Sequence, residues 1–201
     1  MWLALNSRWV NPPNFGCKLV KALVKPAGQN NAIPPAKAAS GGSAGKLSGT
    51  TKKFINDVSK DYPDFKIERG AREHWSPKSS TITYSPAQTP ERIRFGILHE
   101  LAHGLLGHTN YQSDFELLKM ESEAWHLAAQ IGLKYGVTIS EDHIQNCLDT
   151  YRNWLHRRSQ CPTCEMHVLQ DSGSSYKCFN CGASWNVSSG RFVRPYRRTR
   201  K

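Results

Sequence analysis

The chain has 201 residues and a formal net charge of +11, from 27 Lys and Arg against 16 Asp and Glu. That length accommodates one ordinary domain plus a small module and tails. No apolar run approaches the roughly 18 residues that a membrane span needs, and the apolar start at residues 1–5 is too short for a signal-peptide core. We therefore expect neither a membrane-spanning protein nor a secreted one.

The charge is unevenly distributed along the chain. Residues 1–56 carry 8 basic and no acidic residues, residues 57–151 carry 9 basic and 14 acidic, and residues 152–201 carry 10 basic and 2 acidic. A polyanion such as nucleic acid would therefore meet the two ends and not the centre. The alternative is that both ends are solvated tails.

Residues 1–50 form a basic N-terminal segment that passes into a flexible linker. From residue 26 the composition is dominated by Ala, Gly, Ser, Pro and Asn, which cannot bury enough apolar surface to order themselves. A short helix is expected over residues 52–61. Alternating residues at 65–67 and 81–84, with turn residues between them, favour a β-hairpin.

Three longer helices are expected next. A start at Thr89-Pro90-Glu91 predicts a helix to about Leu106. A capping box formed by Ser113 and Glu116 predicts a second helix that reaches Tyr135. A third helix should begin after Ser140, because the following apolar residues recur at helical spacing; Cys147 is among them and is interpreted as core packing.

The first of these helices contains His99-Glu100-Leu101-Ala102-His103. Residues four apart share a helix face, so both imidazoles can reach one metal ion while Glu100 projects beside them. Three protein ligands leave a fourth position on a catalytic zinc for water, and Glu100 would take its proton as the water attacks a peptide carbonyl. The pattern predicts a zinc metallopeptidase. The alternative is a buried polar pair on a helix that only looks like this motif.

The third zinc ligand is expected on the next helix, which a short connection makes an antiparallel neighbour of the first. Glu121 shares its face with apolar residues, whereas Glu123 lies on a polar face. A carboxylate on the buried face needs a partner, which a metal ion supplies, so Glu121 is preferred to Glu123. His108 lies roughly 140° around the helix from His103 and is interpreted as a helix-end residue.

These motifs carry a resemblance to a known family. His-Glu-Leu-Ala-His, then Leu-Leu-Gly-His, then a Glu-x-Glu-Ala helix resemble the ImmA/IrrE-type metallopeptidases, a gluzincin-like family, over roughly residues 50–137. The resemblance implies a compact α+β zinc protease domain, whose relatives cleave DNA-binding repressors. The chain has Trp125 where the family commonly has an Asn or Asp that supports the histidines. A group that stabilises the oxyanion is also expected, with four candidates: His126, His143, Tyr111 and Tyr151.

Four cysteines form two Cys-x-x-Cys pairs with 13 residues between them: Cys161, Cys164, Cys178 and Cys181. This spacing predicts a closed tetrahedral zinc site in a ribbon and a reducing compartment, hence a cytoplasmic protein. Such a site has no open position for catalysis. The chain should therefore bind two zinc ions, one catalytic and one structural.

The residues after the ribbon are basic with interleaved aromatics, a composition that suits phosphate contacts and base stacking. A solubilising end is the alternative. The candidate nucleic-acid-binding residues are Arg191, Arg194, Arg197, Arg198 and Arg200.

The predicted architecture is α+β: a small helical zincin-like metallopeptidase domain with a β-hairpin at residues 51–158, a zinc-ribbon module at 159–190 and a basic tail at 191–201. The expected function is zinc-dependent hydrolysis of peptide bonds in a protein substrate, such as a DNA-bound regulator. One alternative is a SprT-like protease acting on DNA-associated proteins, although its third ligand is usually a later histidine. Another is a non-enzymatic DNA-binding or scaffold protein, against which the intact Glu100 argues.

Overall fold

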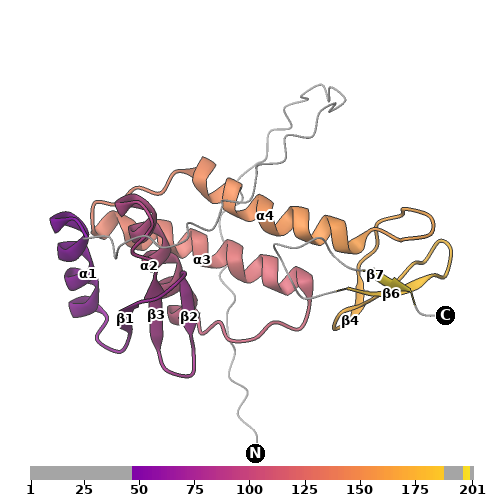
Figure 1. The fold of residues 1–201 in the computed structure, drawn as a ribbon, viewed down its shortest axis with the longest axis horizontal. Helices are drawn as coiled ribbons and strands as arrows, with labels where there is room; N and C mark the ends of the chain where they lie inside the picture. The colour runs from indigo at the N-terminus through magenta and orange to yellow at the C-terminus, as the bar shows by residue number, and fades with distance from the viewer. Residues whose placement is uncertain (1–46, 188–196, 200–201) are drawn as a thin grey trace, which may run out of the picture. The chain divides into compact units, whose positions relative to one another are not determined.

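The computed structural model describes residues 47–187 and 197–199 (Figure 1). The N-terminal basic segment, nearly all of the predicted linker and part of the basic tail lie outside the described residues. No helix in the described part of the chain combines the length and the apolar character that a membrane crossing requires.

The described residues form the α+β fold that the sequence predicts. The first part consists of four helices and a three-stranded sheet: α1 Gly49–Asp61, β1 Lys66–Arg69, β2 His74–Ser76, β3 Thr81–Tyr84, α2 Pro90–Leu105, α3 Asp114–Lys134 and α4 Glu141–Ser159. A four-stranded sheet follows: β4 Gln170–Ser172, β5 Ser175–Lys177, β6 Ser184–Val187 and β7 Arg197–Thr199.

Each helix begins at a hydroxyl cap whose oxygen accepts a hydrogen bond from a backbone N–H three residues later, and the four caps are Ser48, Thr89, Ser113 and Ser140. The predicted starts of α2, α3 and α4 are confirmed. Helix α1 begins three residues earlier than expected, because Ser48 provides the cap. The carboxylate of Glu116 accepts from the N–H of Gln112 at 2.6 Å, one residue before the N-cap, which closes a shifted capping box.

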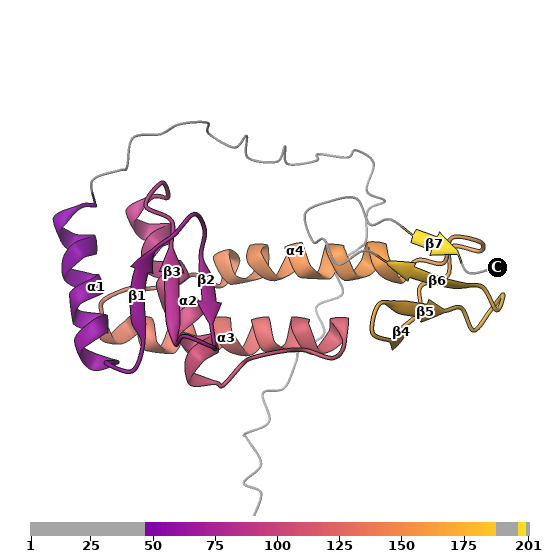
Figure 2. The same ribbon diagram turned by 60° about the horizontal axis from the view of Figure 1, so that its bottom comes forward.

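The three-stranded sheet has the order β1-β3-β2. The expected hairpin between residues 65–67 and 81–84 is wrong in its partners, because β1 runs parallel to β3. The hairpin is formed instead by β2 and β3, which pair antiparallel from His74 with Thr83 to Ser76 with Thr81. The sequence does not reveal strand β2, because three residues are too few to show a clear alternation. It becomes one edge of the sheet, beside the end of α2 (Figures 1 and 2).

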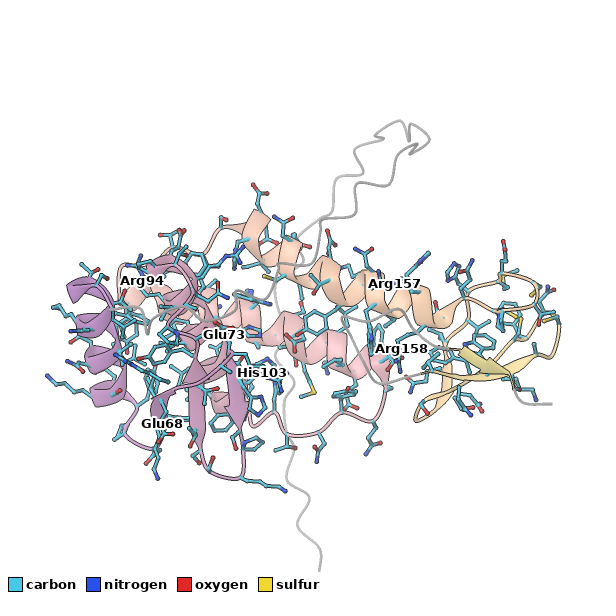
Figure 3. All side chains as sticks on the ribbon, in the orientation of Figure 1. Glu68, Glu73, Arg94, His103, Arg157 and Arg158 are labelled. Carbon is cyan, nitrogen blue, oxygen red and sulfur yellow. The ribbon has the colours of Figure 1, made fainter. Side chains whose placement is uncertain are left out.

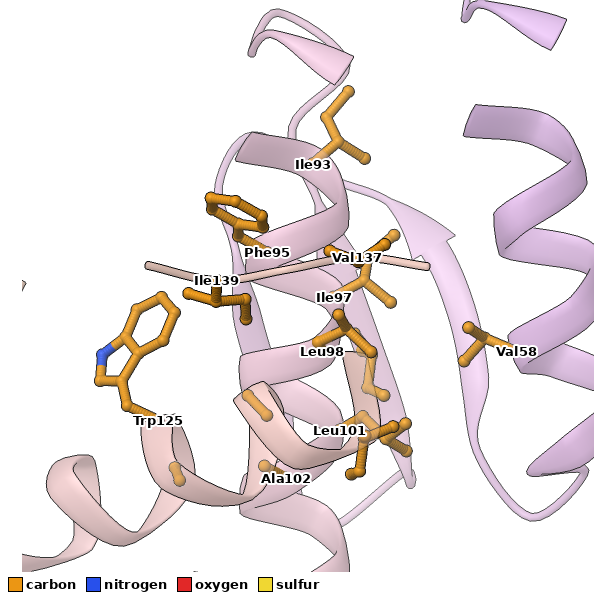
Figure 4. Close-up of a cluster of buried hydrophobic side chains, with 14 of the residues drawn as sticks. Val58, Ile93, Phe95, Ile97, Leu98, Leu101, Ala102, Trp125, Val137 and Ile139 are labelled. Carbon is orange, nitrogen blue, oxygen red and sulfur yellow. The ribbon is translucent and has the colours of Figure 1, made fainter. Parts of the chain in front are cut away.

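Helix α2 is the centre of the main core (Figure 4). Its Ile97, Leu98 and Leu101 are fully buried among side chains from α1, α3 and the sheet. Gly104 lets the ring of Phe65 lie directly on the helix, since a Cβ at this position would collide with that ring. Helix α2 crosses α3 and packs against it, and α4 lies alongside α3 in both views (Figures 1 and 2). This packing determines which side chain of α3 meets the histidines of α2.

Candidate metal centres

The first candidate centre lies between α2 and α3. His99 and His103 stand one turn apart on α2, and Glu121 comes from α3; all three are buried. Nε2 of His99 is 3.1 Å from Nε2 of His103 and 3.2 Å from Oε2 of Glu121, and Nε2 of His103 is 3.7 Å from Oε1 of Glu121. Tetrahedral zinc with bonds of about 2.0–2.1 Å holds its ligand atoms roughly 3.3 Å apart. The three side chains fit such an ion.

The carboxylate of Glu121 is held in its ionised form. Burial by itself would raise the pKa of Glu121, but the contacts with His103 and His99 outweigh burial and hold the pKa well below its usual value. The Glu121 side chain is 10% exposed and that of Glu123 is 47% exposed. The helix phase inferred from the sequence is therefore correct: the buried carboxylate of this pair faces the histidines, and the other faces solvent.

Glu100 approaches the same group from α2. Its carboxyl accepts a hydrogen bond from the backbone N–H of Trp75 on β2. Burial raises the pKa of Glu100 to about 7; the charges of Glu121 and Glu73 act in the same direction, while His103 and the Trp75 N–H act against it. A carboxyl group in this state can both accept and return a proton near neutral pH.

Trp125 supports the first centre by stacking. Its ring lies on that of His99, with centroids 4.1 Å apart and planes inclined by 27°. An indole thus orients His99 at the position where the resembled family commonly has an amide or carboxylate.

Among the oxyanion candidates, His143 packs edge-on against Trp125 at 5.4 Å, whereas His126 is exposed and bonded to Gln130.

His108 makes a contact that the sequence pattern did not predict. Its Nδ1 lies 2.9 Å from Nδ1 of His103, and its Nε2 lies 3.6 Å from a carboxylate oxygen of Glu123. Burial, followed by the charge of His103, lowers the pKa of His108. Treating the chain as a continuing helix placed His108 on the far side, but Gly107 turns the backbone with φ of +67° and brings it back.

The second candidate centre is formed by the four cysteines. The sulfur atoms of Cys161 and Cys181 are 3.6 Å apart, and those of Cys164 and Cys178 are 3.5 Å apart. A disulfide needs about 2.05 Å, whereas four thiolates on one zinc at about 2.3 Å lie roughly 3.8 Å from each other. The amide of Asn180 donates to Sγ of Cys164 and, with the backbone N–H of Met166, lowers the pKa of that thiol to about 6. The cluster fits a structural zinc, as the spacing predicts.

A comparison with protein families shows which known domain the first part of the chain resembles. Residues 61–159 match the family described as Peptidase_M78, the IrrE N-terminal-like domain. These residues are similar to the IrrE N-terminal-like domain. The match begins in the last residue of α1 and ends in that of α4, so it contains the whole first candidate centre and excludes the four cysteines. The family supports a metallopeptidase-type function. Neither curated proteins nor solved structures gave a significant match.

A buried polar group of Asp114, Arg158 and Tyr176 joins residues 61–159 to the ribbon, and Figure 3 labels its Arg158 near the end of α4. Asp114, in the first turn of α3, accepts from Nε of Arg158 at 2.8 Å and from the hydroxyl of Tyr176 on β5. The indole of Trp185 on β6 donates to the carbonyl of Arg158 at 3.0 Å. The side-chain oxygen of Gln170 on β4 accepts from the N–H of Asp114 at 2.6 Å. The ribbon is thus hydrogen-bonded to the first turn of α3 and to the last turn of α4.

Part of the predicted basic tail belongs to the ribbon sheet. Strand β7 pairs antiparallel with β6, so that Arg197 lies opposite Val187 and Arg198 opposite Asn186. Arg191, Arg194 and Arg200 lie outside the described residues. The nucleic-acid-binding role of these arginines stays a prediction.

Proposed function

We propose that this protein is a zinc-dependent endopeptidase whose catalytic ion is held by His99, His103 and Glu121. The observation that carries the proposal is the convergence of three ligand atoms from two helices beside Glu100, whose pKa burial raises to about 7. A purely structural site has no use for a carboxyl group poised to exchange a proton, so the arrangement supports hydrolysis rather than a scaffold.

Each residue of this centre has a distinct task in the proposed reaction. A zinc ion held by His99, His103 and Glu121 would supply a Lewis acid that polarises a peptide carbonyl and eases the ionisation of water. Glu100 accepts a proton from the attacking water and returns it to the leaving amine. Trp125 keeps the His99 ring in place and covers one side of it. The buried Glu121 adds negative charge that offsets part of the charge of the ion.

The ribbon supports this function without taking part in the chemistry. We assign its four cysteines to a structural zinc, which implies a compartment where thiols stay reduced, such as the cytoplasm. A closed site of four thiolates contributes folding free energy to a module too small to fold on its own core.

The proposed substrate is a protein, and a DNA-bound regulator suits the charge distribution. The segment after residue 151 carries 10 basic and 2 acidic residues, against 9 and 14 in the preceding segment. The arginines of this segment can contact phosphates and bring the acidic peptidase domain close to a DNA-associated protein. A Glu as third ligand and the match to the IrrE N-terminal-like family favour this function over that of a SprT-like protease.

The decisive experiment compares zinc content and proteolysis in matched variants. The wild type should carry two zinc ions per chain; His99→Ala should lose one and Cys161→Ser the other, because the two ligand sets are separate. Glu100→Gln should keep both ions and lose cleavage of a protein library. Retention of both ions in His99→Ala, or cleavage by Glu100→Gln at the wild-type rate, would refute the proposal.

A further inference from the structure

The end of α2 carries His108 back onto His103. The N–H of His108 donates to the carbonyl of His103 at 2.9 Å, and that of Gly107 to the carbonyl of Gly104 at 3.1 Å. These two bonds with a left-handed residue at Gly107 form a Schellman motif. The indole of Trp75 on β2 donates to the carbonyl of His108 at 3.1 Å. Backbone bonds therefore place His108 independently of its ring.

The ring of His108 links His103 with Glu123. It lies 2.9 Å from Nδ1 of His103 on one side and 3.6 Å from the Glu123 carboxylate on the other. The His108 side chain is only 11% exposed, so water has little access to compete for these contacts. The other carboxylate oxygen of Glu123 lies 3.8 Å from Nζ of Lys119, whose side chain is 64% exposed.

The contacts from His103 through His108 to Glu123 allow a single arrangement of protons once Nε2 of His103 binds a metal. Nδ1 of His103 must then carry the proton, which it donates to Nδ1 of His108. His108 must in turn carry its proton on Nε2, which faces the carboxylate of Glu123. Each ring nitrogen of His103 and His108 then either binds the metal, donates a proton or accepts one, and the series of contacts ends at the carboxylate of Glu123.

We propose that His108, oriented by Glu123, is a positioning residue that fixes the ring and tautomer of His103 for metal binding. The inference rests on the proposed zinc site. His108 is not a fourth ligand, because it meets the nitrogen of His103 that points away from His99 and Glu121. Partners of this kind commonly change metal affinity 10- to 100-fold when removed.

The test measures zinc affinity of the first centre in the full-length chain, by competition with a chelator. His108→Leu should weaken zinc binding 10- to 100-fold. His108→Asn keeps an acceptor at the position of Nδ1 and should restore affinity to within a few-fold of the wild type. Lys119→Ala is the matched control, because it removes the other partner of Glu123 without touching His108, and it should bind zinc like the wild type.

A spectroscopic readout separates positioning from general loss of structure. In the zinc-loaded wild type, nitrogen-15 NMR of the histidine rings should show His108 with its proton on Nε2, and Glu123→Gln should weaken that preference. Equal affinities of His108→Leu and the wild type, or equal losses in His108→Leu and His108→Asn, would overturn the proposal. If His99→Ala also leaves zinc affinity unchanged, the metal site itself is wrong. If His99→Ala loses the ion while His108→Leu keeps full affinity, only the positioning role fails.

Discussion

Replacing Asp114 with alanine should be among the most destabilising single changes in this protein that leave both metal groups intact. Asp114 and Arg158 are 4% and 3% exposed, and Asp114 is the carboxylate that faces the guanidinium. Removing one partner of a buried ion pair leaves the other charge desolvated, which costs about 3–5 kcal/mol. At about 2–4 °C per kcal/mol for a chain of this length, the melting temperature should fall by roughly 6–20 °C.

Two companion variants divide this loss into its parts, and a third serves as a control. Tyr176→Phe deletes a single hydrogen bond to the carboxylate and should cost about 1.5–3 kcal/mol. Asp114→Leu combined with Arg158→Met replaces both charges by apolar groups and should recover most of the stability, because the penalty comes from removing one charge of a buried ion pair and keeping the other. Lys53→Ala breaks an exposed pair with Asp57 and should leave the melting temperature within about 2 °C.

The assay is thermal unfolding of the zinc-loaded chain, followed by circular dichroism with zinc content measured before and after. Near-equal melting temperatures for Asp114→Ala and Lys53→Ala would show that the polar group between α3, α4 and the ribbon is hydrated and contributes little. A double variant as unstable as Asp114→Ala would show that shape, and not charge burial, decides the loss.

Three further outcomes are expected. Glu121→Ala should release the zinc of the first centre while Glu123→Ala still binds one ion there, because only Glu121 reaches both histidines; metal analysis giving the reverse would contradict the ligand set. Gly107→Ala should cost about 1 kcal/mol in denaturant unfolding, since φ is +67° with open space around it, and an unchanged midpoint would argue against the Schellman turn. Replacing the arginines of residues 191–200 with glutamine should reduce the slope of log binding constant against log salt concentration for DNA by about 0.9 for each phosphate that is no longer neutralised. An unchanged slope would show that these arginines are solvated side chains. Substitution is preferred to deletion because β7 pairs with β6.

Local chemistry determined much of this protein from the sequence alone. The starts of α2, α3 and α4 were predictable because a hydroxyl cap acts within three residues of itself. The placement of His99, His103 and Glu121 on facing helices was predictable because helical phase tells a buried carboxylate from an exposed one. The cysteine cluster follows from spacing, since a metal requires its four thiolates at one point.

Tertiary structure decided what no local pattern carries. Strand β2 exists because β3 offers it a hydrogen-bonding edge, and the parallel pairing of β1 with β3 depends on the packing of α1 and α2 against the sheet. His108 reaches His103 because one left-handed glycine reverses the backbone, which breaks the periodicity on which helical phase relies. Asp114 contacts Arg158 and Tyr176, which lie 44 and 62 positions further along the chain. The charges of this group affect stability strongly only because folding buries them away from water, which no local pattern reveals.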